Sequence, residues 1–206
     1  PLTPMKLSLQ YLQKSIAGNA DNVTELTASV AATLVEQIDH LNHIAGEFGQ
    51  FANIANSKNE IFNLNETINQ VILLHTVDDH INISWKPVRE TILVNADRTH
   101  LNRLFTNLIL NAMQAIPVER NVLINVDEEI NGNKVLIKIE DNGIGIEDDL
   151  QARIFIPNFT TKTSGTGLGL AMSKGIVEQA KGKIWFQTKA GVGSTFYVEL
   201  PIVIPS

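Results

Sequence analysis

The sequence predicts an α+β protein in which a helical hairpin is followed by a mixed α/β sandwich. Two observations predict this division. Residues 1–57 carry apolar side chains at helical spacings and contain no strand-like run. From about residue 60, short alternating runs typical of half-buried strands are interspersed with helical patterns. We therefore expect a helical dimerisation hairpin over residues 1–57 and a second domain over residues 58–206.

Two apolar series within residues 1–57 predict the two helices of the hairpin. The first runs through Leu2, Met5, Leu9, Leu12 and Ile16, and the second through Ala31, Leu34, Ile38, Leu41, Ala45, Phe48 and Ala52. A turn over residues 17–22, rich in Gly, Asn and Asp, separates them. Two helices alone bury little, so we expect a second copy to complete a four-helix bundle, which makes the chain a homodimer through residues 1–57. A hairpin packed on its own C-terminal half is the alternative.

Strand and helix patterns then follow one another through the second domain. We expect strands over residues 61–64, 81–85, 91–95, 122–128, 134–140, 183–188 and 195–200, and helices over residues 66–75, 98–116 and 168–180. Asp97 suits the N-cap of the second helix, Pro117 its end, and Asn131-Gly132-Asn133 a hairpin turn. The order predicts a mixed sandwich with helices on one face of the sheet.

Composition excludes several classes of partner. The chain of 206 residues has a formal net charge of -6, which argues against nucleic acid as the main partner. It has no cysteine, so disulfides and thiolate metal sites are excluded. No apolar run has the length of a bilayer span, so we expect a cytoplasmic location. Any attachment to an inner membrane would come from other parts of a longer parent protein.

A glycine-rich string precedes the last predicted helix. Gly165, Gly167 and Gly169 would let the backbone approach a phosphate chain, and a helix N-terminus offers free N–H groups to it. A dinucleotide-binding turn is disfavoured, because that motif follows a buried strand and residues 160–164 do not form one. A mobile glycine loop remains the alternative.

Two asparagines lie four residues apart on the helix predicted over residues 98–116. Asn107 and Asn111 therefore project from one face, among apolar neighbours where amides are costly unless they bind something. An amide oxygen is a hard ligand suited to Mg²⁺, whose other positions go to water and phosphate. Simple capping or exposed amides are the alternative.

An acidic residue followed by two glycines comes directly after a predicted strand. The carboxylate of Asp141 could accept a hydrogen bond from an exocyclic amine, while Gly143 and Gly145 would let a base slide against the backbone. An ordinary Asp-Gly turn is the alternative reading of this segment.

In this order the segments resemble the ATP-binding boxes of sensor histidine kinases, within the wider ATPase superfamily of type II topoisomerases and heat-shock chaperones. Residues 107–111 resemble the N box, 141–146 and 165–170 the two glycine boxes, and 193–196 the last turn of the pocket. Residues 155–162 resemble the F box, although Asn158 stands where a second aromatic is usual. Residues 111–115 and 159–162 look most like the nitrogen-regulation type.

The resemblance implies a role for each segment in binding ATP and Mg²⁺. Asn111 would hold Mg²⁺, Asn107 would support the phosphates or metal, and Lys162 would meet phosphate from a lid over residues 147–164. Asp141 would accept from the adenine amine, and Thr195 would close the base pocket. The remaining residues implied to bind the nucleotide are Gly143, Gly145, Phe159, Thr160, Gly165, Thr166, Gly167, Leu168 and Gly169.

The resemblance also implies the reaction. Hydrolysing relatives carry a Glu in place of Asn107, and an amide cannot act as that base, so we expect transfer of the γ-phosphoryl group to a histidine and then to a response-regulator receiver domain. Residues 1–4 resemble the end of the motif that bears the acceptor histidine, which would then precede Pro1, so these residues alone are not expected to autophosphorylate. A non-catalytic dimeric ATP-binding module and an ATP hydrolase are the alternatives.

Overall fold

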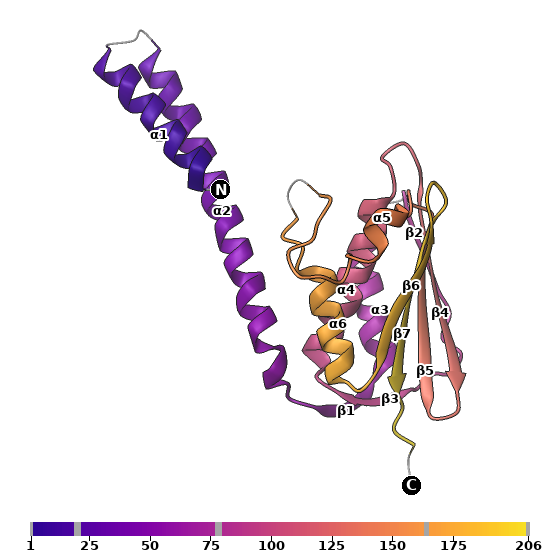
Figure 1. The fold of residues 1–206 in the computed structure, drawn as a ribbon. Coiled ribbons are helices and arrows are strands. Elements are labelled where there is room, and N and C mark those ends of the chain that lie inside the picture. Colours follow the sequence, from indigo (N-terminus) through magenta and orange to yellow (C-terminus); the bar gives the residue numbers. More distant parts are fainter. Residues whose placement is uncertain (1, 19–21, 77–79, 163–164, 205–206) are drawn as a thin grey trace. The chain divides into compact units, whose positions relative to one another are not determined.

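A computed structural model describes residues 2–18, 22–76, 80–162 and 165–204 (Figure 1). The chain divides into two compact units, Pro1–Gln50 and Phe51–Ser206, so that the division falls earlier than the expected one after residue 57. The middle of the predicted turn, residues 19–21, lies outside the described residues.

The first unit consists of α1 (Leu2–Ala17) and most of α2 (Val23–Ala52). Among the side chains of this unit that the structure describes, Val30 alone is fully buried. Positions of the predicted seam on α2 remain open: Ile38 is 48% exposed, Phe48 is 56% exposed, and Ala45 is exposed as well. The seam is therefore not filled by the unit's own side chains.

A five-stranded sheet forms the base of the second unit. Its strands are β2 (Ile81–Trp85), β4 (Val122–Asn131), β5 (Lys134–Asp141), β6 (Lys183–Lys189) and β7 (Gly193–Pro201). They lie in the order β2-β4-β5-β7-β6, with β2 parallel to β4 and every other pair antiparallel. A second, two-stranded sheet pairs β1 (Glu60–Asn63) with β3 (Leu93–Ala96).

Helices cover one face of the larger sheet, as the sequence predicted (Figure 1). They are α3 (Leu64–His75), α4 (Arg98–Ala115) and α6 (Gly169–Gln179). Two short helices complete the unit: η1 (Asn53–Asn56) precedes β1, and α5 (Asp148–Gln151) follows β5. The core lies between the two layers, where Leu104, Phe105 and Leu108 of α4 and Ile137 and Ile139 of β5 are at most 1% exposed.

Local signals explain where these elements begin and end. Asp97 caps α4 as predicted, because its Oδ1 accepts from the backbone N–H of His100 at 3.1 Å. The β4–β5 hairpin is longer than predicted, since Asn131 pairs with Lys134 and leaves only Gly132 and Asn133 in the turn. The single turn α5 was not predicted, because four residues are too short for a periodic pattern.

Among the described residues, no helix combines the length and the apolar character needed to span a bilayer.

Candidate functional site

The candidate site is built around α4, whose three successive turns each contact a different segment of the second unit. Asn107 contacts the start of α6, Asn111 contacts Lys162, and the backbone of Ala115 contacts the segment after β5. The two asparagines and the glycine string, which are far apart in sequence, are thus brought to one place.

Asn107 joins α4 to the first turn of α6. Its Nδ2 donates to Oγ of Ser173 at 2.8 Å, and that hydroxyl donates to the carbonyl of Gly169 at 3.0 Å. A Cβ on Gly169 would collide with Oδ1 of Asn107, so a larger residue here would force that amide to move. The amide therefore holds the glycine string against α4.

Asn111 presents its oxygen to a cation. Its Nδ2 faces Oδ1 of Asn107 at 3.4 Å, which turns its own Oδ1 towards Nζ of Lys162 at 2.8 Å. The same ammonium also donates to Oε1 of Gln114 at 2.6 Å. Although the side chain of Lys162 is exposed overall, partial burial of its charged group lowers the pKa of Lys162.

Asp141 ends β5 as a buried carboxylate. Its Oδ1 accepts from the backbone N–H groups of Gly143 at 2.9 Å and Ser194 at 3.2 Å, and the residue is 5% exposed. Burial raises the pKa of Asp141, and the two backbone N–H groups oppose this rise. Among the described residues both hydrogen bonds fall on Oδ1, so Oδ2 keeps its capacity to accept.

The segment after Asp141 packs against the end of α4. The N–H of Ile144 donates to the carbonyl of Ala115 at 2.9 Å, and a Cβ on Gly143 would lie 2.7 Å from that same carbonyl oxygen. Gly145 has a φ of +70° and packs against the backbone of Lys189. Both glycines are therefore required by close backbone approach.

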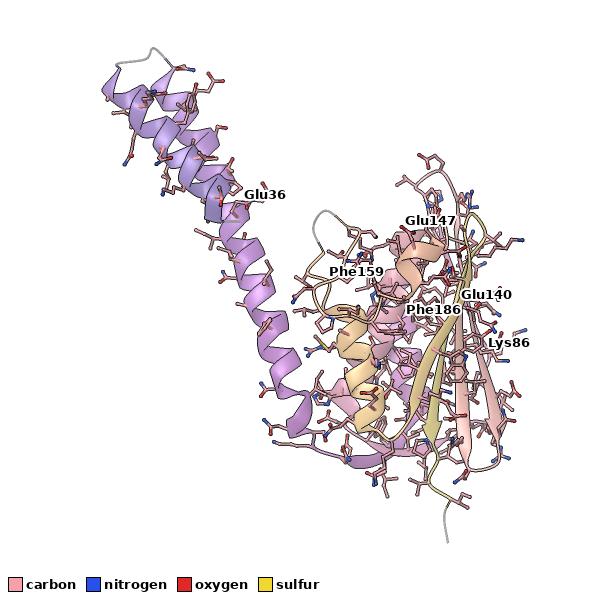
Figure 2. All side chains as sticks on the ribbon, viewed as in Figure 1. Glu36, Lys86, Glu140, Glu147, Phe159 and Phe186 are labelled. Carbon is pink, nitrogen blue, oxygen red and sulfur yellow. The ribbon has the colours of Figure 1, made fainter. Side chains whose placement is uncertain are left out.

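The glycine string also packs against the segment that resembles the F box. Gly167 has a φ of +71°, its carbonyl accepts from the N–H of Asn158 at 3.0 Å, and a Cβ there would lie 2.6 Å from the backbone of Phe159. The ring of Phe159, labelled in Figure 2, lies under the guanidinium of Arg153, whose Cζ is 4.4 Å from the ring centre. Thr163 and Ser164 of the predicted lid lie outside the described residues.

The glycine string leads into the N-terminus of α6. Leu168 occupies the N-cap position without a side-chain cap, so the first N–H groups of α6 are available for an anion. Before it, Oγ1 of Thr166 accepts from the N–H of Leu168 at 3.3 Å, and Oγ1 of Thr160 accepts from the N–H of Lys162 at 3.0 Å. A Cβ on Gly165 would lie 2.6 Å from the hydroxyl oxygen of Thr160.

The structure does not support the predicted role of Thr195. Thr195 pairs with Glu140, whereas Ser194 pairs with Asp141. Because successive side chains of a strand alternate between faces, Thr195 lies on the outer face of the sheet, away from Asp141. Ser194 lies on the inner face, and its Oγ is 2.9 Å from Oγ1 of Thr188. The sequence prediction chose a hydroxyl one position too late.

Sequence reasoning missed Gln114 and Ser173. Gln114 follows Asn111 by three residues and Asn107 by seven, so helical spacing alone places it on the same face of α4. Ser173 follows Gly169 by four residues, and it could have been found as a serine on the buried face of α6.

The donor set fits a metal ion that arrives with a ligand of its own. Among the residues that the structure describes, no group of three or more His, Asp or Glu side chains could hold a metal. The oxygen of Asn111 already attracts a cation, the ammonium of Lys162. One amide oxygen, with the remaining positions left to water and phosphate, is a set that Mg²⁺ uses.

A hollow of about 310 Å³ lies at the end of β2, β4 and β5, largely on the outer face of the sheet. Its lining includes the outward-facing residues Asn82, Ser84, Leu123, Asn125, Glu140 and Asn142. Asp141 and Ile124 also line the hollow, so it reaches the end of β5, whereas the glycine string and the amides of α4 do not line it. The hydrogen-bonded constellation on α4 is the stronger indication of chemistry.

Comparison with known proteins finds relatives of this chain. Residues 96–204 match the family described as histidine kinase-, DNA gyrase B- and HSP90-like ATPase. The chain is similar to the signal transduction histidine-protein kinase AtoS of Escherichia coli, with 44% identity over 109 residues, or 53% of this chain and 18% of AtoS. It is similar to the sensor protein kinase WalK of Staphylococcus epidermidis, with 34% identity over 152 residues, or 70% of this chain and 25% of WalK.

Solved structures show the same fold. The catalytic domain of the histidine kinase ThkA superposes with a TM-score of 0.63 and 34% identity, covering 70% of this chain and 95% of that domain. ThkA in complex with the response regulator protein TrrA superposes with a TM-score of 0.68 and 24% identity, covering 98% of this chain and 60% of ThkA. Of the two curated relatives, the chain spans only 18% of the length of AtoS and 25% of the length of WalK.

Proposed function

Because the chain belongs to the histidine kinase-, DNA gyrase B- and HSP90-like ATPase family, we propose that its second unit binds ATP with Mg²⁺ and presents the γ-phosphoryl group to a histidine. The phosphoryl group would pass from there to an aspartate of a response regulator. The names of the histidine kinases AtoS and ThkA and of the sensor protein kinase WalK support this reading over others within the family.

One observation carries the proposal. A single helix, α4, brings the glycine string, the segment that resembles the F box and the segment after Asp141 to one place through Asn107, Asn111 and Ala115. A nucleotide needs a base site and a phosphate site held at a fixed separation, and one helix provides that spacing.

The base would bind at the end of β5. Oδ2 of Asp141 would accept from the exocyclic amine of adenine, while Gly143 leaves the adjoining backbone free of side-chain bulk. The fixed orientation of the carboxylate comes from the N–H groups of Gly143 and Ser194, which hold Oδ1. Ser194 takes the place in the base pocket that sequence reasoning gave to Thr195.

The phosphates would bind at the N-terminus of α6. Leu168 leaves the first N–H groups of α6 uncapped, and Gly165, Gly167 and Gly169 add no side chains to the approach, although the N–H of Gly165 itself donates to the carbonyl of Lys162 at 3.3 Å. Thr160, Thr166 and Lys162 would contribute polar groups from the neighbouring segments. Mg²⁺, when bound, would neutralise part of the phosphate charge, and Asn111 is the residue that would hold it.

Asn107 favours transfer over hydrolysis. Its Nδ2 is committed to Ser173, and an amide has no basic atom with which to activate water. The γ-phosphoryl group would therefore be transferred only when a nucleophile from outside the pocket reaches it. The alternative of an ATP hydrolase predicts rapid turnover of Mg–ATP by this chain alone.

The partners form part of the same proposal. The exposed seam of α2 supports a homodimer through residues 1–57, and the complex of ThkA with TrrA supports a response-regulator receiver domain as the second partner. Residues 111–115 and 159–162 support the nitrogen-regulation type. Because ATP is the substrate, we place this part of the chain in the cytoplasm.

Calorimetric titration with a non-hydrolysable ATP analogue tests the proposal. Asn111→Ala should weaken binding in the presence of Mg²⁺ at least tenfold, which corresponds to about 1.4 kcal/mol, and should change binding without metal much less. Asp141→Asn should weaken binding of the adenine nucleotide while leaving the backbone contacts to Oδ1 in place. Asn102→Ala, on the same helix outside the site, is the matched control.

Each alternative has its own signature in this titration. No heat with the wild-type protein would contradict the nucleotide site altogether. An affinity that neither substitution changes would show that the nucleotide binds away from α4. Tight binding by a parent protein whose histidine is never phosphorylated would favour the non-catalytic module.

A further inference from the structure

Lys162 occupies an unusual position for a residue assigned to phosphate. Its ammonium donates to Oδ1 of Asn111 at 2.8 Å and to Oε1 of Gln114 at 2.6 Å. Asn111 is the residue that would hold Mg²⁺, so the ammonium uses the same oxygen as the metal would. Both contacts are short and are made to neutral oxygens on one face of α4.

The ammonium and a divalent ion compete for this position. Mg²⁺ binds oxygen at about 2.0–2.1 Å, so a metal on the same oxygen would lie within about 5 Å of Nζ. Like charges at that separation repel strongly when they are partly shielded from water. The ammonium of Lys162 therefore has to leave Asn111 when the metal arrives.

We propose that Asn111 and Gln114 form a cradle that holds the Lys162 ammonium in the nucleotide-free protein, as a latch that a metal-bound nucleotide must displace. This inference rests on the proposed function, because it names how the same site is regulated. Gln114 is here a positioning residue, which acts on the site through Lys162.

The latch restrains the backbone next to the glycine string. Lys162 is tied to Thr160 through its own N–H at 3.0 Å, and Asn158 is tied to Gly167 at 3.0 Å. Holding Nζ of Lys162 on α4 therefore holds residues 158–162 over the start of α6. Once Mg²⁺ takes Asn111, the freed ammonium is the nearest cation available to the phosphates on the same segment.

The latch reduces the apparent affinity for nucleotide, because part of the binding energy goes to opening it. Removing one arm of the cradle should therefore increase the affinity, which is opposite to the effect expected of a residue that contacts nucleotide. Gln114→Leu removes the second contact while leaving Asn111 and Lys162 intact. Gln70→Leu, an exposed glutamine on α3, is the matched control.

The experiment combines hydrogen exchange with calorimetry on the full chain. In the nucleotide-free protein without metal, Gln114→Leu should raise the exchange rate of the amides of residues 158–162. In titrations with ADP and Mg²⁺ it should lower the dissociation constant about threefold to tenfold. In a Lys162→Met background the effect of Gln114→Leu on both measurements should disappear, because no ammonium remains for the cradle to hold.

The possible results separate the latch from the site itself. Weaker binding of Mg–ADP by Gln114→Leu in both backgrounds would overturn the latch, since Gln114 would then contact the nucleotide. Unchanged exchange together with unchanged affinity would overturn it as well, since the cradle would not restrain the segment. If wild-type protein binds no Mg–ADP, the proposed function fails, and the exchange rates alone then decide whether the cradle forms.

Discussion

Residues 1–50 and residues 51–206 bury their apolar side chains to very different extents. In the first unit, Val30 is the one described side chain that is fully buried, whereas Leu7, Tyr11, Val35 and Phe48 are 56–61% exposed. In the second unit a continuous core runs between the sheet and its three long helices. The second unit therefore contains what it needs for its own stability, and the first unit does not.

This contrast agrees with the two tasks that we propose for the chain. The proposed nucleotide site requires side chains fixed to within an ångström, and such fixing comes from a closed core around α4. The first unit leaves an apolar stripe exposed along α2, and such a stripe is stabilised when a second copy covers it.

The same substitution in the two units should expose this difference most strongly. Phe105→Ala empties a position that is 0% exposed and should lower the free energy of unfolding of the second unit by about 3–5 kcal/mol. Phe48→Ala removes a ring that is 56% exposed and should change that free energy by less than about 0.5 kcal/mol.

Tryptophan fluorescence during denaturant unfolding can measure the second unit alone. Both tryptophans of the chain, Trp85 and Trp185, lie in that unit. The difference between the two units would be refuted if Phe48→Ala shifted the fluorescence transition as far as Phe105→Ala does.

The sequence was sufficient for the features that depend on periodicity and order. The alternation of β4 and β5, the cap at Asp97 and the helical spacing of Asn107 and Asn111 are local, and the structure bears out the fold they predict. These features need only neighbours along the chain, so their physical causes can be read from a window of a few residues.

Features that depend on pairing between strands or on side-chain reach could not be predicted in the same way. Whether Ser194 or Thr195 lies beside Asp141 is set by the register of β7 against β5, and a shift of one residue reverses the face. The contact of Lys162 with Gln114 spans 48 positions in sequence, and nothing local indicates it.

A charge placed on the seam of α2 should weaken dimerisation through the first unit without changing the stability of the second unit. Ala45→Glu puts a carboxylate on an exposed seam position, where it would be buried in a dimer, and should raise the dimer dissociation constant about tenfold, or about 1.4 kcal/mol. Sedimentation equilibrium measures this constant, and the fluorescence transition of the second unit should not move. Ala32→Glu, an exposed position off the seam, is the control and should leave the dissociation constant unchanged.

The smallest effect concerns an ionisable group within the core of the second unit. Glu128 of β4 is 6% exposed, and its Oε1 accepts from the N–H of Val88 at 2.9 Å. Among the described residues, its Oε2 has no hydrogen-bond partner, and the same is true of Oδ1 of Asn65. Burial raises the pKa of Glu128 above its ordinary value of 4.5, against the opposing effects of the Val88 and Arg89 N–H groups, the Asn65 side chain and the charge of Arg89.

A raised pKa in the folded state means that the folded protein binds the proton more tightly than the unfolded chain. This contribution of Glu128 is fully present below pH 4.5 and is lost as the pH rises through the folded-state pKa. Glu128→Gln keeps the acceptor for Val88 and removes the buried negative charge, so it should stabilise the second unit by about 1 kcal/mol at pH 8 and by nearly nothing at pH 4.

Glu129, the next residue on the opposite face of the sheet, is the matched control for this measurement. Its pairing with Lys138 at 2.9 Å lowers the pKa of Glu129, so its stabilising contribution is present above pH 4.5 and is lost as the pH falls. Glu129→Gln should therefore destabilise slightly at pH 8, with the opposite sign to Glu128→Gln. Equal effects of the two substitutions across this range would show that the core of the second unit does not distinguish a buried carboxylate from an exposed one, and the contrast between closed and open surfaces would lose its physical basis.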